Sequence, residues 1–287
     1  MSIEITIAFV EQYRANVQLL SQQKGSRLSR AVRNESVTGK NAYFEQIGAV
    51  AARIRPSRHA DTPRMDTPHA RRQVTLNDYD WADLIDDEDK VRMLIDPTSS
   101  YAASAAFAMG RAKDDAIIAA AVGTAKTGVS GGDSTILPSD QKVAHGSAGL
   151  NLAKLLEAKE ILDGNDIDPD IPRFIALAAG QVSDLLNTSE IKSSDYNTVK
   201  ALAQGQLNTF LGFEFIRTQR LGLDADSKRQ VTCWAKDGIL LAVGKDMTTR
   251  ISERGDKNYA TQVFNSMTIG ATRMEEVKVV EIACQEA

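Results

Sequence analysis

Cysteine and long hydrophobic runs are both scarce in this sequence. The two cysteines of the 287 residues, Cys233 and Cys284, have no CxxC spacing and no paired histidines nearby. This usage is typical of small buried thiols in a reducing compartment, and it favours that interpretation over a disulfide. The best apolar run, residues 116–122, is far shorter than the ~18 residues of a membrane span. Glu4 and Glu11 interrupt the apolar start, unlike in a signal peptide. We expect a protein that is neither secreted nor bound to a membrane.

Motifs for catalysis, nucleotide binding and metal binding are missing as well. The glycine-rich residues 123–130 lack the G-x-x-x-x-G-K-[ST] spacing of a phosphate-binding loop. His145 has no nucleophile motif such as G-x-S-x-G around it. His59 and His69 flank two aspartates, but they lie on no regular element, and the neighbouring arginines disfavour a dication. We therefore predict no catalytic residue, no cofactor and no metal site, and we expect the protein not to be an enzyme.

The bulk composition is that of an ordinary soluble globular protein, with 43% hydrophobic and 25% charged residues. This length and composition suit one large domain or two small ones. The net charge of −4 and the pI near 5.5 argue against a protein whose whole surface binds nucleic acid. Any contact with phosphate groups must therefore be local.

Charge is concentrated in two stretches of opposite sign. Residues 53–72 hold six arginines and no lysine against two aspartates, whereas residues 80–89 hold six acids and no base. Guanidinium–carboxylate pairs fix the register between protein surfaces, and a DNA-binding tail usually contains lysine as well. We therefore interpret the two stretches as a docking interface between subunits, with a DNA-binding arm and a solvated helix start as alternatives. The interface candidates are Arg53, Arg55, Arg58, Arg64, Arg71 and Arg72, and the acids Asp80, Asp83, Asp86, Asp87, Glu88 and Asp89.

The arginine-rich stretch is predicted to form the tip of a long hairpin. Residues 43–54 and 71–79 are strand candidates on either side of it. Pro56, Pro63 and Pro68 between them remove amide donors and push the preceding residues towards extended conformations. A long open hairpin satisfies both observations.

One long helix dominates the centre of the chain. Asp96 is a good N-cap and Pro97 suits the first helical position, so we predict a spine-like helix over residues 97–122. The glycine-rich residues 123–132 after it are interpreted as a flexible connector and domain boundary. The Asp-Gly pair at residues 237–238 is the strongest hairpin signal in the chain. Further helices are expected at 86–95, 152–164, 182–186 and 198–204, and strands at 174–179, 211–217 and 276–283.

Helices and strands mix without a regular βαβ repeat, so the predicted fold class is α+β. Several stretches also carry a family resemblance: Q-Q-K-G-S-R-L, E-Q-I-G-A-V-A-A-R-I-R-P-S-R-H-A-D-T-P, H-A-R-R-Q-V-T-L, K-V-R-M-L-I-D-P-T-S-S-Y and M-G-R-A-K-D-D-A-I-I-A-A. They resemble the major capsid proteins of tailed bacteriophages, which share the Hong Kong 97 capsid fold. The specific motifs lie within residues 1–130, and the later part of the chain is similar in the order of its elements.

The resemblance implies a division of the chain by role in a shell. The expected parts are an N-terminal arm (1–41), an extended E-loop hairpin (42–80), a peripheral domain (81–132) with the spine helix (97–122), an axial domain (133–240), and a return to the peripheral domain (241–287).

The resemblance also implies a function and partners. A protein of this family would assemble through hexamers and pentamers into the icosahedral shell of a virion, around phage double-stranded DNA, in the host cytoplasm. Its partners would be other copies of itself, non-specifically bound DNA on the inner face, and a scaffolding protein, a portal and a decoration or cement protein. The alternatives are an encapsulin-like or gene-transfer-agent shell protein of the same fold and, less favoured, a nucleic-acid-binding protein that uses the arginine arm.

Overall fold

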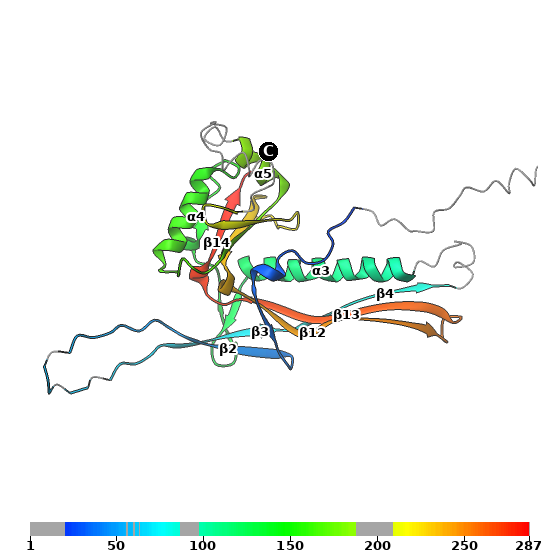
Figure 1. The fold of residues 1–287 in the computed structure, drawn as a ribbon, viewed down its shortest axis with the longest axis horizontal. Helices are drawn as coiled ribbons and strands as arrows, with labels where there is room; N and C mark the ends of the chain where they lie inside the picture. Colours follow the sequence, from blue (N-terminus) through cyan, green and yellow to red (C-terminus); the bar gives the residue numbers. More distant parts are fainter. Residues whose placement is uncertain are drawn as a thin grey trace, which may run out of the picture. The chain divides into compact units, whose positions relative to one another are not determined.

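The structure is a computed structural model, and it describes residues 21–55, 57–59, 61, 62, 64–86, 98–187 and 209–286. The described residues fall into two compact units. Figure 1 labels the main helices and strands. The first unit is drawn from Met1–Ser26, Asp78–Ala112 and Lys245–Thr268, and the second from Arg27–Asn77, Lys113–Gly244 and Ile269–Ala287. No helix in the described part of the chain is long and apolar enough to cross a membrane.

A six-stranded sheet forms the core of the second unit. Its strand order is β7-β14-β11-β8-β10-β9. β11 lies between β8 and β14 and is antiparallel to both, whereas β8 and β10 are parallel. The central strands are apolar and buried, as expected for strands covered on both faces. The strands are β7 (Lys142–Val143), β8 (Arg173–Leu177), β9 (Thr209–Phe210), β10 (Phe213–Arg217), β11 (Arg229–Ala235) and β14 (Val279–Cys284).

The second unit also contains α4 (Leu152–Gly164) and α5 (Ala179–Asn187). Asn151 caps α4, because its side chain accepts a hydrogen bond from the amide of Lys154. Leu155, Ala158 and Leu162 lie on one helix face and are fully buried. Both helices and the strands β8, β10 and β14 confirm the elements predicted there from the sequence.

A second sheet in this unit contains the predicted hairpin. β2 (Asn41–Ile47) and β3 (His69–Thr75) are antiparallel, from the pair Asn41↔Thr75 to the pair Ile47↔His69. The sheet continues through β5 (Ala125–Thr127) and β6 (Asp133–Thr135), in the order β2-β3-β5-β6. The prediction of a flexible connector at residues 123–132 is therefore wrong. Its glycines instead supply a tight turn, since Gly128 and Gly131 have φ values of 89° and 71°.

The Asp-Gly signal at residues 237–238 was also misleading. These residues form the 3₁₀ turn η3 (Lys236–Gly238), which joins strands of two different sheets. β11 takes its partners from β8 and β14, whereas β12 (Ile239–Arg254) begins by pairing with β1 (Arg33–Ser36) in parallel. A tight turn fixes only local geometry, and the partner of each strand is decided by tertiary packing.

The first unit contains β4 (Asn77–Ile85), the outer halves of β12 and of β13 (Ala260–Arg273), and the beginning of α3 (Thr98–Val122). The strand order β12-β13-β4 places β13 in the middle. The α3 helix confirms the spine helix predicted over residues 97–122. The remaining short helical turns are η1 (Ser29–Ala31), η2 (Ser139–Gln141) and η4 (Glu276–Lys278). The helix predicted at 86–95, apart from its first residue, the helix predicted at 198–204 and the arm before residue 21 lie outside the described residues.

Gly110 of α3 lies in contact with the backbone of the arm. A Cβ atom at this position would lie 2.4 Å from the carbonyl carbon of Gly25 and 2.6 Å from the amide of Ser26. Gly110→Ala must therefore displace the arm, and we expect a loss of about 1–3 kcal/mol from overpacking. Thermal unfolding and proteolysis between residues 21 and 26 measure the effect. Gly164→Ala at the end of α4 is the matched control, since a Cβ atom there meets nothing within 4 Å. Equal stability of the two variants would contradict the close crossing.

Both cysteines are free and buried. Burial raises the pKa of the Cys233 thiol from 9.0 to about 12 and that of Cys284 to about 11. At pH 8 both are neutral thiols, so we expect neither to react with iodoacetamide until the chain is unfolded. Above pH 9 the thiols of the unfolded chain ionise, whereas those of the folded chain stay protonated. Ionisation therefore favours the unfolded state, and the free energy of unfolding falls as the pH rises above 9. Labelling of the native protein at pH 8 would contradict this arrangement.

Candidate subunit interface

Residues 48–68 extend the β2–β3 hairpin into an exposed loop, called the extended loop below. Gly48 donates a backbone hydrogen bond to Pro68 O (2.9 Å) at its root. Every described residue from Gly48 to Pro68 is exposed, including Val50 (64%) and Ile54 (91%). Large apolar side chains on an extended segment gain stability only when another surface covers them. The predicted long open hairpin is confirmed.

Four of the six predicted interface arginines lie on the extended loop. Arg55 donates to the carbonyl oxygens of Ser57 (2.9 Å) and Arg58, which keeps these contacts within the loop. Arg64 is paired with Asp66 at 3.3 Å, and both side chains are about nine-tenths exposed. Such a pair contributes little stability, because water screens it. The guanidinium groups of Arg53, Arg55, Arg58 and Arg64 therefore belong to an exposed surface.

Arg71 has partners inside its own chain. Its Nε donates to Glu45 Oε1 (2.6 Å) on β2, and one terminal nitrogen donates to Val129 O (2.9 Å) in the β5–β6 turn. The guanidinium also lies 5.6 Å from the ring centroid of Tyr43, within cation–π range. These contacts join β2, β3 and the β5–β6 hairpin across one face of the sheet.

Arg72 is buried, and its predicted contact with a neighbouring subunit is corrected accordingly. It is 7% exposed, its Nε donates to Met274 O (2.8 Å), and its terminal nitrogen pairs with Glu276. Gln46 of β2 donates to the same carbonyl oxygen (2.8 Å). A neighbouring subunit cannot reach this guanidinium without unfolding the loop root. Arg72 therefore holds the hairpin to its own chain.

Arg273 is the second buried guanidinium at this point. It is fully buried and donates to the carbonyl oxygens of Ala121 (3.0 Å), Gly123 (2.7 Å) and Thr135 (3.0 Å). Its Nε lies 3.5 Å from Glu276, and burial lowers the pKa of this guanidinium while Glu276 opposes the shift. One side chain thus satisfies carbonyl groups at the C-terminal end of α3 and on β6. We call Arg72, Arg273 and Glu276 the root cluster; the sequence carried no signal for it beyond a basic and an acidic residue three positions apart.

The predicted acids lie only in part on described residues. Asp80 and Asp83 are exposed on β4, and Asp86 is exposed just after it. Asp87, Glu88 and Asp89 lie outside the described residues. β4 is the last strand in its sheet order, so these exposed carboxylates follow a sheet edge. Their role in an interface stays a prediction.

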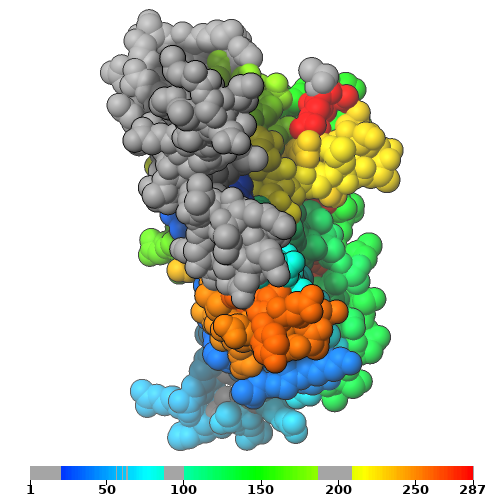
Figure 2. All heavy atoms as spheres, turned by 90° about the vertical axis from the view of Figure 1, so that its right-hand side faces the viewer, coloured from blue at the N-terminus to red at the C-terminus, as the bar shows by residue number. Residues whose placement is uncertain are grey.

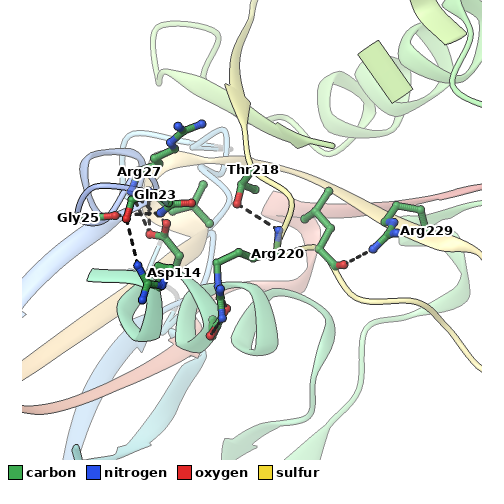
Figure 3. A network of polar contacts seen from close by, with 11 residues as sticks. Gln23, Gly25, Arg27, Asp114, Thr218, Arg220 and Arg229 are labelled. Atoms are coloured by element: carbon green, nitrogen blue, oxygen red, sulfur yellow. Dashed lines mark hydrogen bonds and ion pairs between the residues drawn. The ribbon is translucent and has the colours of Figure 1, made fainter. Parts of the chain in front are cut away.

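Asp114 of α3 holds the backbone at Arg27 and Leu28, within the predicted N-terminal arm. This fully buried carboxylate accepts hydrogen bonds from the backbone amides of Arg27 and Leu28, each at 3.1 Å (Figure 3). The Arg27 side chain donates to Arg217 O (2.6 Å) on β10. A buried carboxylate bonded to two amides is a strong local restraint. The sequence analysis did not single out Asp114, because nothing in its local pattern distinguishes it from other helix carboxylates.

The carboxylate, thiol and imidazole groups and one hollow in the described part of the chain bear on the prediction of no metal site and no catalytic residue. No group of three or more His, Cys, Asp or Glu side chains there could hold a metal ion. A hollow of about 250 Å³ beside α5 is lined by Arg27, Ala179, Val182, Arg217, Thr218 and Gln219. This lining contains no pair of a nucleophile and a base.

The exposed loop on its braced root, the long α3 helix and the separate sheets together form a fold that is similar to several solved capsid structures. The chain is similar to the capsid of the cyanophage P-SCSP1u, with a TM-score of 0.74, 16% identity, and 99% and 95% of the two chains covered. It is also similar to the head of Helicobacter pylori bacteriophage KHP40 (0.74, 12%, 99% and 98%) and to the capsid of a native GTA particle (0.69, 12%, 96% and 96%). These likenesses confirm the predicted fold class.

The family model described as phage capsid protein matches residues 5–286. The chain belongs to the phage capsid protein family, and its place is in the shell of a virion. No curated protein matches the sequence.

The root cluster gives a direct test of the loop anchor. Glu276→Ala leaves two buried guanidinium groups without their carboxylate, and we expect a loss of about 3–5 kcal/mol, measured by urea unfolding. Asp66→Ala is the matched control, since it removes the carboxylate of an exposed arginine pair and should leave the unfolding midpoint unchanged. Equal midpoints for the two variants would show that the root cluster does not hold the loop.

Proposed function

We propose that this protein is the major capsid protein whose copies form hexamers and pentamers that close into an icosahedral shell around phage double-stranded DNA. The observation that carries the proposal is the extended loop, which exposes Val50 and Ile54 and makes no backbone hydrogen bond across the hairpin beyond Gly48 in its described residues. A contact between two different surfaces, repeated around a symmetry axis, closes a ring. The role is structural, with no chemical step.

The loop arginines supply the charged part of this contact. Arg53, Arg55, Arg58 and Arg64 are exposed on the loop, and acids such as Asp80, Asp83 and Asp86 are exposed elsewhere on each copy. A partly exposed pair contributes only ~0.2–1 kcal/mol, so stability comes from repetition over many subunits. Opposite charges also set the register of docking and speed the encounter.

The remaining partners follow from the same role. DNA would lie on the inner face and be bound without sequence preference, through local contacts with phosphate groups, because the net charge of −4 gives the chain as a whole no attraction to them. A scaffolding protein, a portal and a decoration or cement protein would complete assembly in the host cytoplasm. The likeness to a GTA particle capsid leaves a gene-transfer-agent shell as the second candidate, and the length of the packaged DNA distinguishes the two.

Reversing the four loop arginines tests the proposal. In Arg53→Glu, Arg55→Glu, Arg58→Glu and Arg64→Glu combined, repulsion from the neighbour's acids should prevent shell formation in electron micrographs. The unfolding midpoint should stay unchanged, because these side chains make only local contacts.

The matched control changes the same four residues to lysine, which keeps the charge and loses the bidentate geometry. We expect this variant to form shells that dissociate at lower salt than the wild type. Normal shells from the glutamate variant would refute the charged contact. Wild-type protein that stays monomeric and binds duplex DNA with steep salt dependence would instead support a nucleic-acid-binding protein.

A further inference from the structure

The first half of the extended loop has the side-chain pattern of a strand without a partner. Residues 48–55 continue from β2 outside any helix or strand and are exposed throughout, and Figure 1 draws this loop as an open trace. In an extended chain alternate residues share a face, so Val50, Ala52 and Ile54 lie on one face and Arg53 and Arg55 on the other. Val50 is 64% exposed and Ile54 is 91% exposed. The segment thus offers two large apolar side chains four residues apart, together with open backbone groups.

The outer half of β12 offers a matching edge. β1 pairs only with Leu240–Val243, so from Lys245 to Arg254 no described strand lies on that side of β12. Residues 245–253 are all exposed, and the outer parts of β12 and β13, coloured orange, face the viewer in Figure 2. Met247 (37% exposed) and Ile251 (54% exposed) lie on one face, also four residues apart. An open edge of this length is a template for a further strand.

The two segments are complementary when they run antiparallel. Placing Val50 opposite Ile251 places Ile54 opposite Met247, so that the apolar pairs share one face. The same register puts Arg55 opposite Asp246 and Arg53 opposite Thr248, so that Arg53 has Asp246 on one diagonal and Arg250 on the other. The small Ala51 then faces the long Arg250. The ladder ends at Pro56, which has no amide hydrogen to donate.

A parallel arrangement is less favourable. Matching Val50 with Met247 and Ile54 with Ile251 would place Arg53 directly opposite Arg250. Like charges directly opposite each other on neighbouring strands are destabilising. The antiparallel register therefore satisfies both the apolar and the charged positions, and the parallel register satisfies only the apolar ones.

We propose that residues 48–55 of one copy add as an antiparallel strand to the open edge of β12, residues 246–253, in a second copy of the chain. The inference rests on the proposed function, because it requires copies to meet in a shell. It assigns the surface that receives the loop: the edge of β12 binds the apolar first half. Arg58 and Arg64 follow Pro56 in the sequence and are left to pair with other acids of the neighbouring copy.

Engineered cysteine pairs in assembled shells test the register. Directly opposed residues on antiparallel strands have Cα atoms about 4.5–5.5 Å apart, a distance that a disulfide can span. We expect the pairs Val50→Cys with Ile251→Cys, and Ile54→Cys with Met247→Cys, to give covalent multimers on a non-reducing gel after mild oxidation. The native cysteines are buried and do not contribute.

The swapped pairs are the matched controls. Val50→Cys with Met247→Cys, and Ile54→Cys with Ile251→Cys, use the same four positions, but the proposed register separates each pair by about four residues, or roughly 13 Å. These controls should stay monomeric on the gel. Multimers from the controls, or disulfides within one chain, would refute the proposed strand.

Two outcomes separate this inference from the proposed function. Intact shells in which neither proposed pair cross-links would overturn the strand addition and leave the shell function standing, whereas wild-type protein that forms no shell would overturn both. If the cysteine variants do not assemble, a cryo-EM map of wild-type shells decides the question. The Val50 and Ile251 Cα atoms of neighbouring copies should lie within about 5.5 Å, and a separation beyond about 10 Å would refute the inference.

Discussion

Two buried arginines share one partly buried glutamate at the root of the extended loop, and the placement of the loop depends on this cluster. Arg72 lies on β3, and Arg273 donates to carbonyl oxygens at the end of α3 and on β6. Glu276 lies against both guanidinium groups. The second positive charge is balanced by carbonyl oxygens rather than by another acid, so the cluster requires all of its backbone partners in place. Sheet, helix and hairpin root are therefore fixed together.

This order at the root contrasts with the surface that the loop presents. At the root the hydrogen bonds of Arg71, Arg72 and Gln46 stay within the chain. Beyond Gly48 the loop exposes apolar side chains that the same chain leaves uncovered in its described residues. A braced root limits the conformational entropy that the loop loses on docking, which is the usual advantage of a preorganised binding segment. In the proposed shell, each copy would supply one weak contact, and the shell would repeat it many times.

The sequence predicted the elements whose signals are local. The α3 helix, the β2–β3 hairpin and β14 follow from caps, prolines and alternation. Prediction from the sequence failed where a strand pairs with a partner that is far away along the chain. The glycine-rich residues 123–132 pair with β3, and the Asp-Gly turn joins two sheets instead of two neighbours. The arginine-rich stretch supplied the interface candidates, four of which are exposed on the loop, and their role in an interface stays a prediction. The sequence could not show that Arg72 is buried, because its burial depends on Met274 and Glu276, 202 and 204 residues away.

Hydrogen–deuterium exchange on unassembled protein and on shells tests the central claim, that a root held by its own chain carries a loop ordered by a neighbouring copy. We expect amides of β3 to be protected in both forms, whereas amides of residues 49–55 and the edge amides of residues 246–253 should become protected only in shells. Protection of residues 49–55 in the unassembled chain, or their continued rapid exchange in shells, would contradict this claim.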